Sequence, residues 1–222
     1  MRLLLYISSF IAITLVSFTS MQQKQKIVFF GDSITQAGVS PTGYITVLGN
    51  LIAQKGLKDQ YELTGAGIGG NKVYDLYLRM EDDVLAKNPN TVVIWVGVND
   101  VWHKKGGTGT DAPKFEQFYN AIIKKLQAKN IKVVLVTPAT IGEKTDFSNE
   151  QDGDLNKYAN IVRTVAAKNN CPLVDLRKTF LAYNLANNPE NKEKGILTAD
   201  GVHLNEKGNM LVADEMAKVL VK

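Results

Sequence analysis

The chain has 222 residues and a mass of 24.4 kDa, which is enough for one well-packed domain and short for two. Hydrophobic residues make up 45% and charged residues 22%, so the composition excludes a disordered or fibrous chain. The formal charge is +4, but the lysines are scattered along presumed helix faces and form no basic stripe. We therefore expect no nucleic-acid partner.

The chain begins with an apolar segment that has the pattern of a secretory signal peptide. Arg2 precedes a nearly charge-free run over residues 3–18, and small polar residues follow it. The run is short for a membrane span, which needs about 20 apolar residues, and no cysteine ends it, which disfavours a lipoprotein. We expect a signal peptide at residues 1–20, a mature domain at 21–222, and a secreted or periplasmic protein without stable membrane insertion. An uncleaved N-terminal anchor is the alternative.

From residue 26 onward, short apolar runs alternate with amphipathic stretches, and no linker or repeat interrupts them. The apolar runs predict strands over residues 26–30, 61–64, 91–96, 132–137 and 173–175. Apolar side chains at spacings of three and four predict helices over residues 44–54, 73–86, 113–128, 154–168 and 206–221. Strands that alternate with helices form parallel βαβ units. We expect an α/β fold, a three-layer α/β/α sandwich around a five-stranded parallel sheet.

Candidate reactive residues directly follow the first three predicted strands. Residues 31–33 follow the first strand, residues 65–67 the second and residues 97–100 the third. In parallel sheets, ligands bind beyond the carboxyl ends of the strands, where the connecting loops gather. These three segments are therefore expected to share one site.

Ser33 is the candidate nucleophile. It lies at a strand-to-helix turn, where Gly31 permits a tight bend and the hydroxyl can project into the cleft. Serine also caps helices, so this segment alone leaves a capping role open. A serine nucleophile needs a base within hydrogen-bond distance, and histidine has a suitable ordinary pKa of about 6.5.

The chain has two histidines. His103 is followed by two lysines, whose charge opposes the uptake of a proton. His203 follows Asp200 by three residues, and a carboxylate there can accept the Nδ1 proton and stabilise the imidazolium. We expect His203 to be the general base and Asp200 to orient it. The alternative is that Asp200 caps a turn and pairs with His203 only locally.

Acyl transfer also requires donors for the oxyanion of the tetrahedral intermediate. The candidates are the backbone N–H groups of Ser33 and Gly67 and the side-chain amide of Asn99. Gly67 and Asn99 could instead be ordinary turn residues, because both residue types tolerate unusual dihedral angles. We further expect Asp32, Asp100 and Trp102 to line the substrate cleft.

The motifs G-D-S-I-T at residues 31–35, G-V-N-D at 97–100 and D-G-V-H-L-N at 200–205 occur in this order, with a glycine-rich block between the first two. Together they resemble the SGNH hydrolase family, also called GDSL esterases and lipases. The resemblance spans residues 27–220. It implies a flavodoxin-like sheet and no metal or organic cofactor. It also implies a triad of Ser33, His203 and Asp200 and an oxyanion hole of Ser33, Gly67 and Asn99.

The second block departs from the family's pattern. Many members have an asparagine two residues before the glycine, and Gly65 stands at that place here. The hydrogen bond that the asparagine would make is expected from another residue, with Asn71 as the candidate. The departure concerns the local loop and not the nucleophile.

Two other functions fit parts of the sequence. Residues 65–70 match the dinucleotide-binding pattern G-x-G-x-x-G, but that pattern belongs in the first strand-to-helix turn, which residues 31–33 occupy. A non-catalytic carbohydrate-binding protein on the same fold is the main alternative. The retained serine, histidine, acid and oxyanion donors argue against it.

The expected substrate is a small-molecule or carbohydrate ester with a small acyl group. The loops at residues 104–111 and 142–152 are polar and glycine-rich, and no apolar lid-like insertion is evident. We therefore favour acetyl esters, which could be attached to carbohydrate, over long-chain lipids.

Overall fold

The structure, a computed structural model, describes residues 24–221. The expected signal peptide at residues 1–20 lies outside the described residues. Within them, no helix is both long enough and apolar enough to cross a membrane.

One parallel sheet of five strands forms the centre of the molecule, as expected. Its strands are β1 (Gln25–Gly31), β2 (Tyr61–Gly67), β3 (Thr91–Trp95), β4 (Lys132–Val136) and β5 (Leu173–Val174). They lie in the order β2-β1-β3-β4-β5. The chain runs from β1 out to β2 and then back across to β3, so the strand order reverses at β1. The crevice at such a reversal is where open α/β sheets bind ligands.

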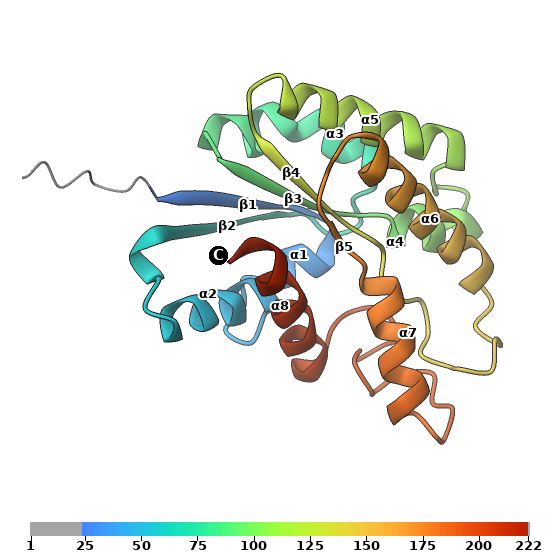
Figure 1. The fold of residues 1–222 in the computed structure, drawn as a ribbon. Helices are drawn as coiled ribbons and strands as arrows, with labels where there is room; N and C mark the ends of the chain where they lie inside the picture. The colour runs from blue at the N-terminus through green and yellow to red at the C-terminus, as the bar shows by residue number, and fades with distance from the viewer. Residues whose placement is uncertain (1–23, 222) are drawn as a thin grey trace, which may run out of the picture.

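Helices cover both faces of the sheet (Figure 1). One face carries α3 (Val73–Asp83), α5 (Ala112–Gln127) and α6 (Asp152–Lys168), and the other carries α2 (Tyr44–Gln54), α7 (Leu176–Asn187) and α8 (Glu206–Leu220). Short helices are α1 (Ser33–Ala37) and α4 (Val98–Trp102), with 3-10 turns η1 (Lys58–Gln60), η2 (Leu85–Lys87) and η3 (His103–Gly106). The three-layer sandwich is confirmed.

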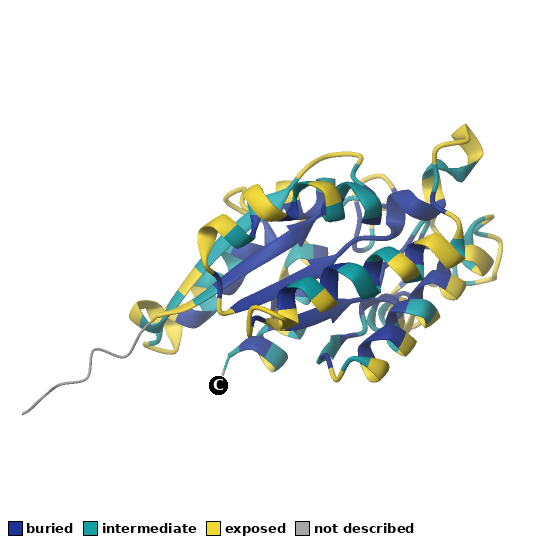
Figure 2. Ribbon diagram, turned by 90° about the horizontal axis from the view of Figure 1, so that it is seen from above, coloured by how far each residue is buried: buried dark blue, intermediate teal, exposed yellow. Residues whose placement is uncertain are grey.

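Two apolar cores lie on the two faces of the sheet because successive side chains of a strand point in opposite directions. In β1, Val28 and Phe30 join the core under α3, α5 and α6, whereas Ile27 and Phe29 join the core under α2, α7 and α8. Figure 2 shows the strands buried and the outer faces of the helices exposed. The sheet is therefore a rigid base for the loops at its carboxyl edge.

Helix α7 was not predicted from the sequence. Asp175 caps it by accepting a hydrogen bond from the N–H of Lys178. Its inward face includes the buried polar Asn184, while Leu181 and Leu185 point outward with 38% and 62% of their surface exposed. This exchange of polar and apolar positions obscures the helical periodicity on which the prediction depends.

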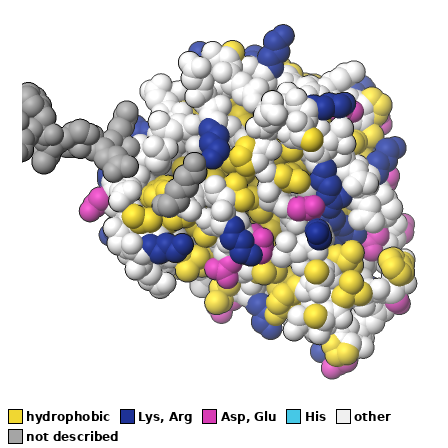
Figure 3. Space-filling view, viewed as in Figure 1, with side chains coloured by type: hydrophobic (Ala, Val, Ile, Leu, Met, Phe, Trp, Pro, Cys, Tyr) yellow, Lys and Arg dark blue, Asp and Glu magenta, His cyan; other side chains and the backbone are white. Residues whose placement is uncertain are grey.

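Charged side chains are dispersed over the face seen in Figure 3, where lysines and arginines lie among acidic and neutral side chains. This view agrees with the scattered charge of the sequence. The expectation of no nucleic-acid partner remains a prediction.

Candidate active site

Ser33 is the first residue of helix α1 and follows the end of β1 by two residues. Asp32 caps the helix by accepting a 3.0 Å hydrogen bond from the N–H of Ile34. Gly31 is required for the turn, since a Cβ there would lie 2.3 Å from Thr35 Oγ1 and 2.4 Å from Trp95 O. The sharp turn places the Ser33 hydroxyl at the carboxyl edge of the sheet and its N–H in the first turn of a helix, where backbone donors lack helical partners.

The structure brings Ser33, His203 and Asp200 together across 170 residues of sequence. Ser33 Oγ lies 2.9 Å from His203 Nε2, and His203 Nδ1 lies 2.7 Å from Asp200 Oδ2. The other oxygen of Asp200 accepts hydrogen bonds from the N–H groups of His203 and Val202, at 2.8 and 2.9 Å. One carboxylate therefore shapes the loop and also orients the imidazole.

The pKa of Asp200 is lowered from its ordinary value. Partial burial alone would raise the pKa, but the hydrogen bonds from the imidazole and the backbone outweigh that effect. Asp200 is therefore an anion at neutral pH, the state that can hold the Nδ1 proton of His203 and stabilise its positive charge.

Glu143 holds the loop that carries the histidine, and sequence reasoning missed it. Its buried carboxylate accepts hydrogen bonds from three consecutive backbone N–H groups, those of Ile196, Leu197 and Thr198, at 2.7–2.9 Å. The N–H of the preceding Gly142 donates to Gly201 O at 2.8 Å. These partners are 53 to 59 residues away in sequence, so no local motif marks the role of Glu143.

Asn99 lies in the first turn of α4 and is 2% exposed. Its Nδ2 donates to Asn71 O at 3.1 Å, which fixes the amide against the turn that follows β2. Arg79 ties that turn to the sheet, donating to Asn71 Oδ1, Gly31 O and Ala66 O at 2.6–2.9 Å. Asn71 therefore holds the turn after β2 through Arg79 and through its own carbonyl group, and its replacement of the missing asparagine stays a prediction.

The oxyanion role expected of Gly67 stays a prediction, and the strand register argues against it. Gly67 pairs in register with Gly31, and it is Ile68 N–H that donates to Gly31 O, so the N–H of Gly67 faces away from β1. A Cβ at Gly67 would lie 2.1 Å from Gln36 N. The glycine is thus needed for the close packing of β2 against α1.

The turn after Gly67 also approaches the nucleophile. A Cβ at Gly69 would lie 3.9 Å from the Cβ of Ser33. The N–H of Gly69 donates to Gln36 Oε1 at 2.9 Å, whereas the N–H of Gly70 has no partner among residues 24–221. Gly70 takes a φ of +76°, a conformation that favours glycine. This turn therefore supplies a backbone donor that the sequence did not single out.

Two of the three expected cleft residues are buried beneath the site, which corrects their assignment. Asp32 is 2% exposed and Asp100 is fully buried. Burial raises the pKa of Asp32 to about 7 and that of Asp100 to about 6. Trp102 is 37% exposed, and its ring centre lies 6.4 Å from that of His203. Its position at the rim fits the expectation.

The arrangement joins a hydroxyl, an imidazole and a carboxylate, and the Asn99 amide contacts the same turn that approaches Ser33. These are the groups that acyl transfer requires. Within residues 24–221, the His, Cys, Asp and Glu side chains form no group that could hold a metal ion. The absence of a cofactor remains a prediction.

Comparisons with known proteins agree with this chemistry. A family model described as the GDSL-like lipase/acylhydrolase family matches residues 29–211. The acetylxylan esterase of Geobacillus stearothermophilus is 29% identical over 213 residues, which cover 85% of this chain and 90% of that protein. The isoamyl acetate-hydrolyzing esterase of Schizosaccharomyces pombe is 23% identical, over 92% of this chain and 79% of that protein.

Among solved structures, the crystal structure of an acetyl xylan esterase, AlAXEase, is 68% identical with a TM-score of 0.87, covering 88% of this chain and 100% of that one. The chain therefore belongs to the GDSL-like lipase/acylhydrolase family, which confirms the resemblance seen in the sequence. It is a carboxylic ester hydrolase.

Proposed function

We propose that the protein removes acetyl groups from carbohydrate esters through an acyl-enzyme on Ser33, with His203 as general base and Asp200 as its orienting acid. The observation that carries the proposal is the continuous chain of hydrogen bonds from Asp200 through His203 to Ser33 Oγ. The acetyl group and the carbohydrate are proposed by analogy with the acetylxylan esterases that the chain resembles.

In the first step, Ser33 Oγ attacks the ester carbonyl while His203 Nε2 takes its proton. The tetrahedral intermediate collapses as His203 returns that proton to the leaving alcohol, and an acetyl-enzyme remains. Water then attacks the acetyl-enzyme by the reverse sequence of proton transfers and releases acetate. The anionic Asp200 stabilises the imidazolium in both halves of the reaction.

The oxyanion of each tetrahedral intermediate is assigned to three donors. They are the N–H of Ser33 at the start of α1, the N–H of Gly70 and the amide of Asn99. Gly70 replaces the expected Gly67, whose N–H faces away from β1. Removal of one such donor in a comparable hydrolase costs roughly 3–4 kcal/mol of transition-state stabilisation.

We propose that the protein meets its ester outside the cytoplasm, because the N-terminal sequence predicts export. Secretion and cleavage near residue 20 remain part of this proposal. Mass spectrometry of the exported protein tests it, because an intact N-terminus would contradict a cleaved signal peptide.

Kinetics on p-nitrophenyl acetate test the catalytic assignment. The wild type is expected to turn over, and Ser33→Ala and His203→Ala are expected to lose activity by a factor on the order of 10³ or more. Equal activity in all three proteins would contradict the assignment. A wild type that is inert but binds oligosaccharides would instead favour the carbohydrate-binding alternative.

A further inference from the structure

A cavity of about 370 Å³ adjoins the catalytic loop and is lined by Asp200, Gly201 and Val202. This volume lies within the roughly 300–1,000 Å³ typical of small-molecule sites. The segment at residues 141–151 forms one wall, and residues 200–202 and Trp102 form others. The proposed mechanism assigns no role to this cavity.

The cavity opens beside His203. Asp200 and Trp102 both line it, and both also lie against the imidazole: Asp200 is 2.7 Å from Nδ1, and the Trp102 ring centre is 6.4 Å from that of the imidazole. In the proposed mechanism, His203 delivers its proton to the leaving oxygen. The leaving oxygen meets Nε2, on the opposite edge of the imidazole from Asp200, so a group attached to that oxygen reaches the cavity past Trp102, which lies against the ring and lines the cavity.

The floor is formed where the two loops meet. Gly142 N–H donates to Gly201 O, and both glycines have positive φ, at +85° and +99°. A Cβ at Gly142 would lie 2.3 Å from Asn149 Oδ1. A side chain at either position would therefore be strained, and the two glycines leave this part of the cavity free of side chains.

Most of the lining side chains are polar, which suits a hydroxyl-rich ligand better than an acyl chain. Lys144 lines the cavity, and its ammonium group has no partner among residues 24–221. Glu193 and Gln151 add acceptor and donor groups, and Trp102 adds one flat apolar surface. Specific sites for small ligands commonly combine such apolar surface with a few placed polar groups.

The outer wall is held in place before any ligand binds. Lys105 pairs with Glu150, and Gln151 Nε2 donates to Val101 O at 3.0 Å, which fastens the wall to α4 and η3. On the other side, Thr145 N–H donates to Asn191 Oδ1 at 2.7 Å. A preorganised wall lowers the entropic cost of binding.

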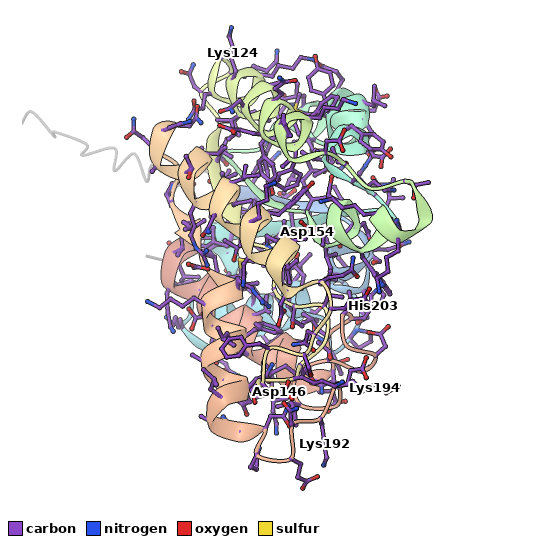
Figure 4. The ribbon with its side chains drawn as sticks, turned by 90° about the vertical axis from the view of Figure 1, so that its right-hand side faces the viewer. Lys124, Asp146, Asp154, Lys192, Lys194 and His203 are labelled. Carbon is purple, nitrogen blue, oxygen red and sulfur yellow. The ribbon has the colours of Figure 1, made fainter. Side chains whose placement is uncertain are left out.

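Phe147 is presented at the tip of this wall. It is 88% exposed and takes a φ of +66°, which is unusual for a residue other than glycine. Asp146 Oδ1 accepts hydrogen bonds from both the N–H and the Oγ of Ser148, which closes a turn around Phe147. Figure 4 shows Asp146 on the same side of the molecule as His203. Residues in strained backbone conformations cluster at active sites and ligand-binding sites.

We propose that this cavity binds the sugar units next to the acetylated one, with Lys144 contacting their hydroxyl groups and Phe147 stacking on a ring at the rim. The proposal rests on the proposed function, since it takes the leaving group to be a carbohydrate. It makes the protein an esterase for oligomeric rather than monomeric sugar esters.

The test compares kcat/KM on an acetylated xylo-oligosaccharide with kcat/KM on p-nitrophenyl acetate, which carries no sugar. In Lys144→Ala and Phe147→Ala, the ratio of the two values is expected to fall at least tenfold. The matched controls are Lys124→Ala, at the far end of the molecule from His203 in Figure 4, and Leu185→Ala on α7. Both controls are expected to change neither value by more than twofold.

A second measurement separates the cavity from the catalytic assignment. Calorimetry measures binding of the unacetylated xylo-oligosaccharide to Ser33→Ala, which requires no turnover. Adding Lys144→Ala or Phe147→Ala is expected to weaken this binding at least tenfold.

Binding that responds to these substitutions, in a protein without esterase activity, would overturn the proposed function and leave the cavity proposal standing. An unchanged kinetic ratio together with unchanged binding would overturn the cavity proposal and leave the esterase. Activity on p-nitrophenyl acetate without any binding or cleavage of the oligosaccharide would also overturn the cavity proposal.

Discussion

At the scale of single residues, Asp200 has two tasks, because its two oxygens serve different partners. Replacing it by asparagine keeps an acceptor for the backbone N–H groups of Val202 and His203 but removes the negative charge beside Nδ1. We expect Asp200→Asn to lower kcat on p-nitrophenyl acetate by a factor on the order of 10²–10⁴ while the fold is retained. Asp214→Asn, at an exposed position of α8, is the control and is expected to keep full activity.

Glu143 acts one step further from the reacting atoms, as a positioning residue. Its carboxylate faces three backbone donors, and an amide there would turn its own N–H₂ group toward at least one of them. We expect Glu143→Gln to lower the free energy of unfolding by about 2 kcal/mol. We also expect kcat to fall at least tenfold with little change in KM, since the histidine loop loses its position.

The control for Glu143→Gln is Glu190→Gln, which changes an exposed carboxylate paired with Lys192. Denaturant unfolding and steady-state kinetics of both variants provide the measurement. Full activity in a destabilised Glu143→Gln protein would show that Glu143 supports the fold without positioning His203.

At the scale of elements, the packing of β2 against α1 depends on Gly67. A Cβ there would lie 2.1 Å from Gln36 N and 2.5 Å from Thr35 C, and backbone atoms cannot rotate away. We expect Gly67→Ala to destabilise the protein by about 2–4 kcal/mol and to displace α1. The matched substitution Gly49→Ala, inside α2 with its nearest contact at 3.9 Å, is expected to stabilise by about 0.5–1 kcal/mol. Thermal unfolding of the two variants tests both the predicted loss and the predicted gain of stability.

The buried carboxylates under α1 and α4 make stability depend on pH. The pKa of Asp32 is about 7 and that of Asp100 about 6 in the folded protein, against 3.8 as the ordinary value. Because the folded state holds these protons more tightly than the unfolded state does, stability falls as pH rises from about 4 to about 7. Above that range the two groups contribute no further change.

Asp32→Asn tests this dependence, because the amide oxygen can still accept the Ile34 N–H while the titration disappears. We expect the variant to be more stable than the wild type at pH 8 and to lose less stability between pH 5 and pH 8. Urea unfolding at both values is the measurement. Parallel pH dependence in the two proteins would contradict the assignment of Asp32.

At the scale of the whole molecule, the fold could be predicted because continuous apolar strands alternate with amphipathic helices, a pattern that permits few topologies. Helix α7 was missed because a buried Asn184 and exposed leucines disturb its periodicity. The predicted strand and helix bounds otherwise differ from the observed ones by a few residues at the ends of the elements.

A site residue could be predicted where the chain offers few residues of the required type. It could not be predicted where the chain offers many. With two histidines in the chain, the choice of His203 needed little information. The second block offers several glycines between residues 65 and 70, and the direction of each N–H depends on strand register, which the sequence does not display. Asp32 and Asp100 look like cleft residues until burial is known, and Glu143 and Arg79 act through partners distant in sequence.

The acetyl-enzyme on Ser33 is the central claim, and it can be observed directly. The protein is mixed with p-nitrophenyl acetate, quenched in acid within the first turnover, digested and examined by mass spectrometry. We predict one added acetyl group on the peptide that contains Ser33 and none in Ser33→Ala. Acetate released at the wild-type rate by Ser33→Ala, or an acetyl group found on another residue, would contradict the account.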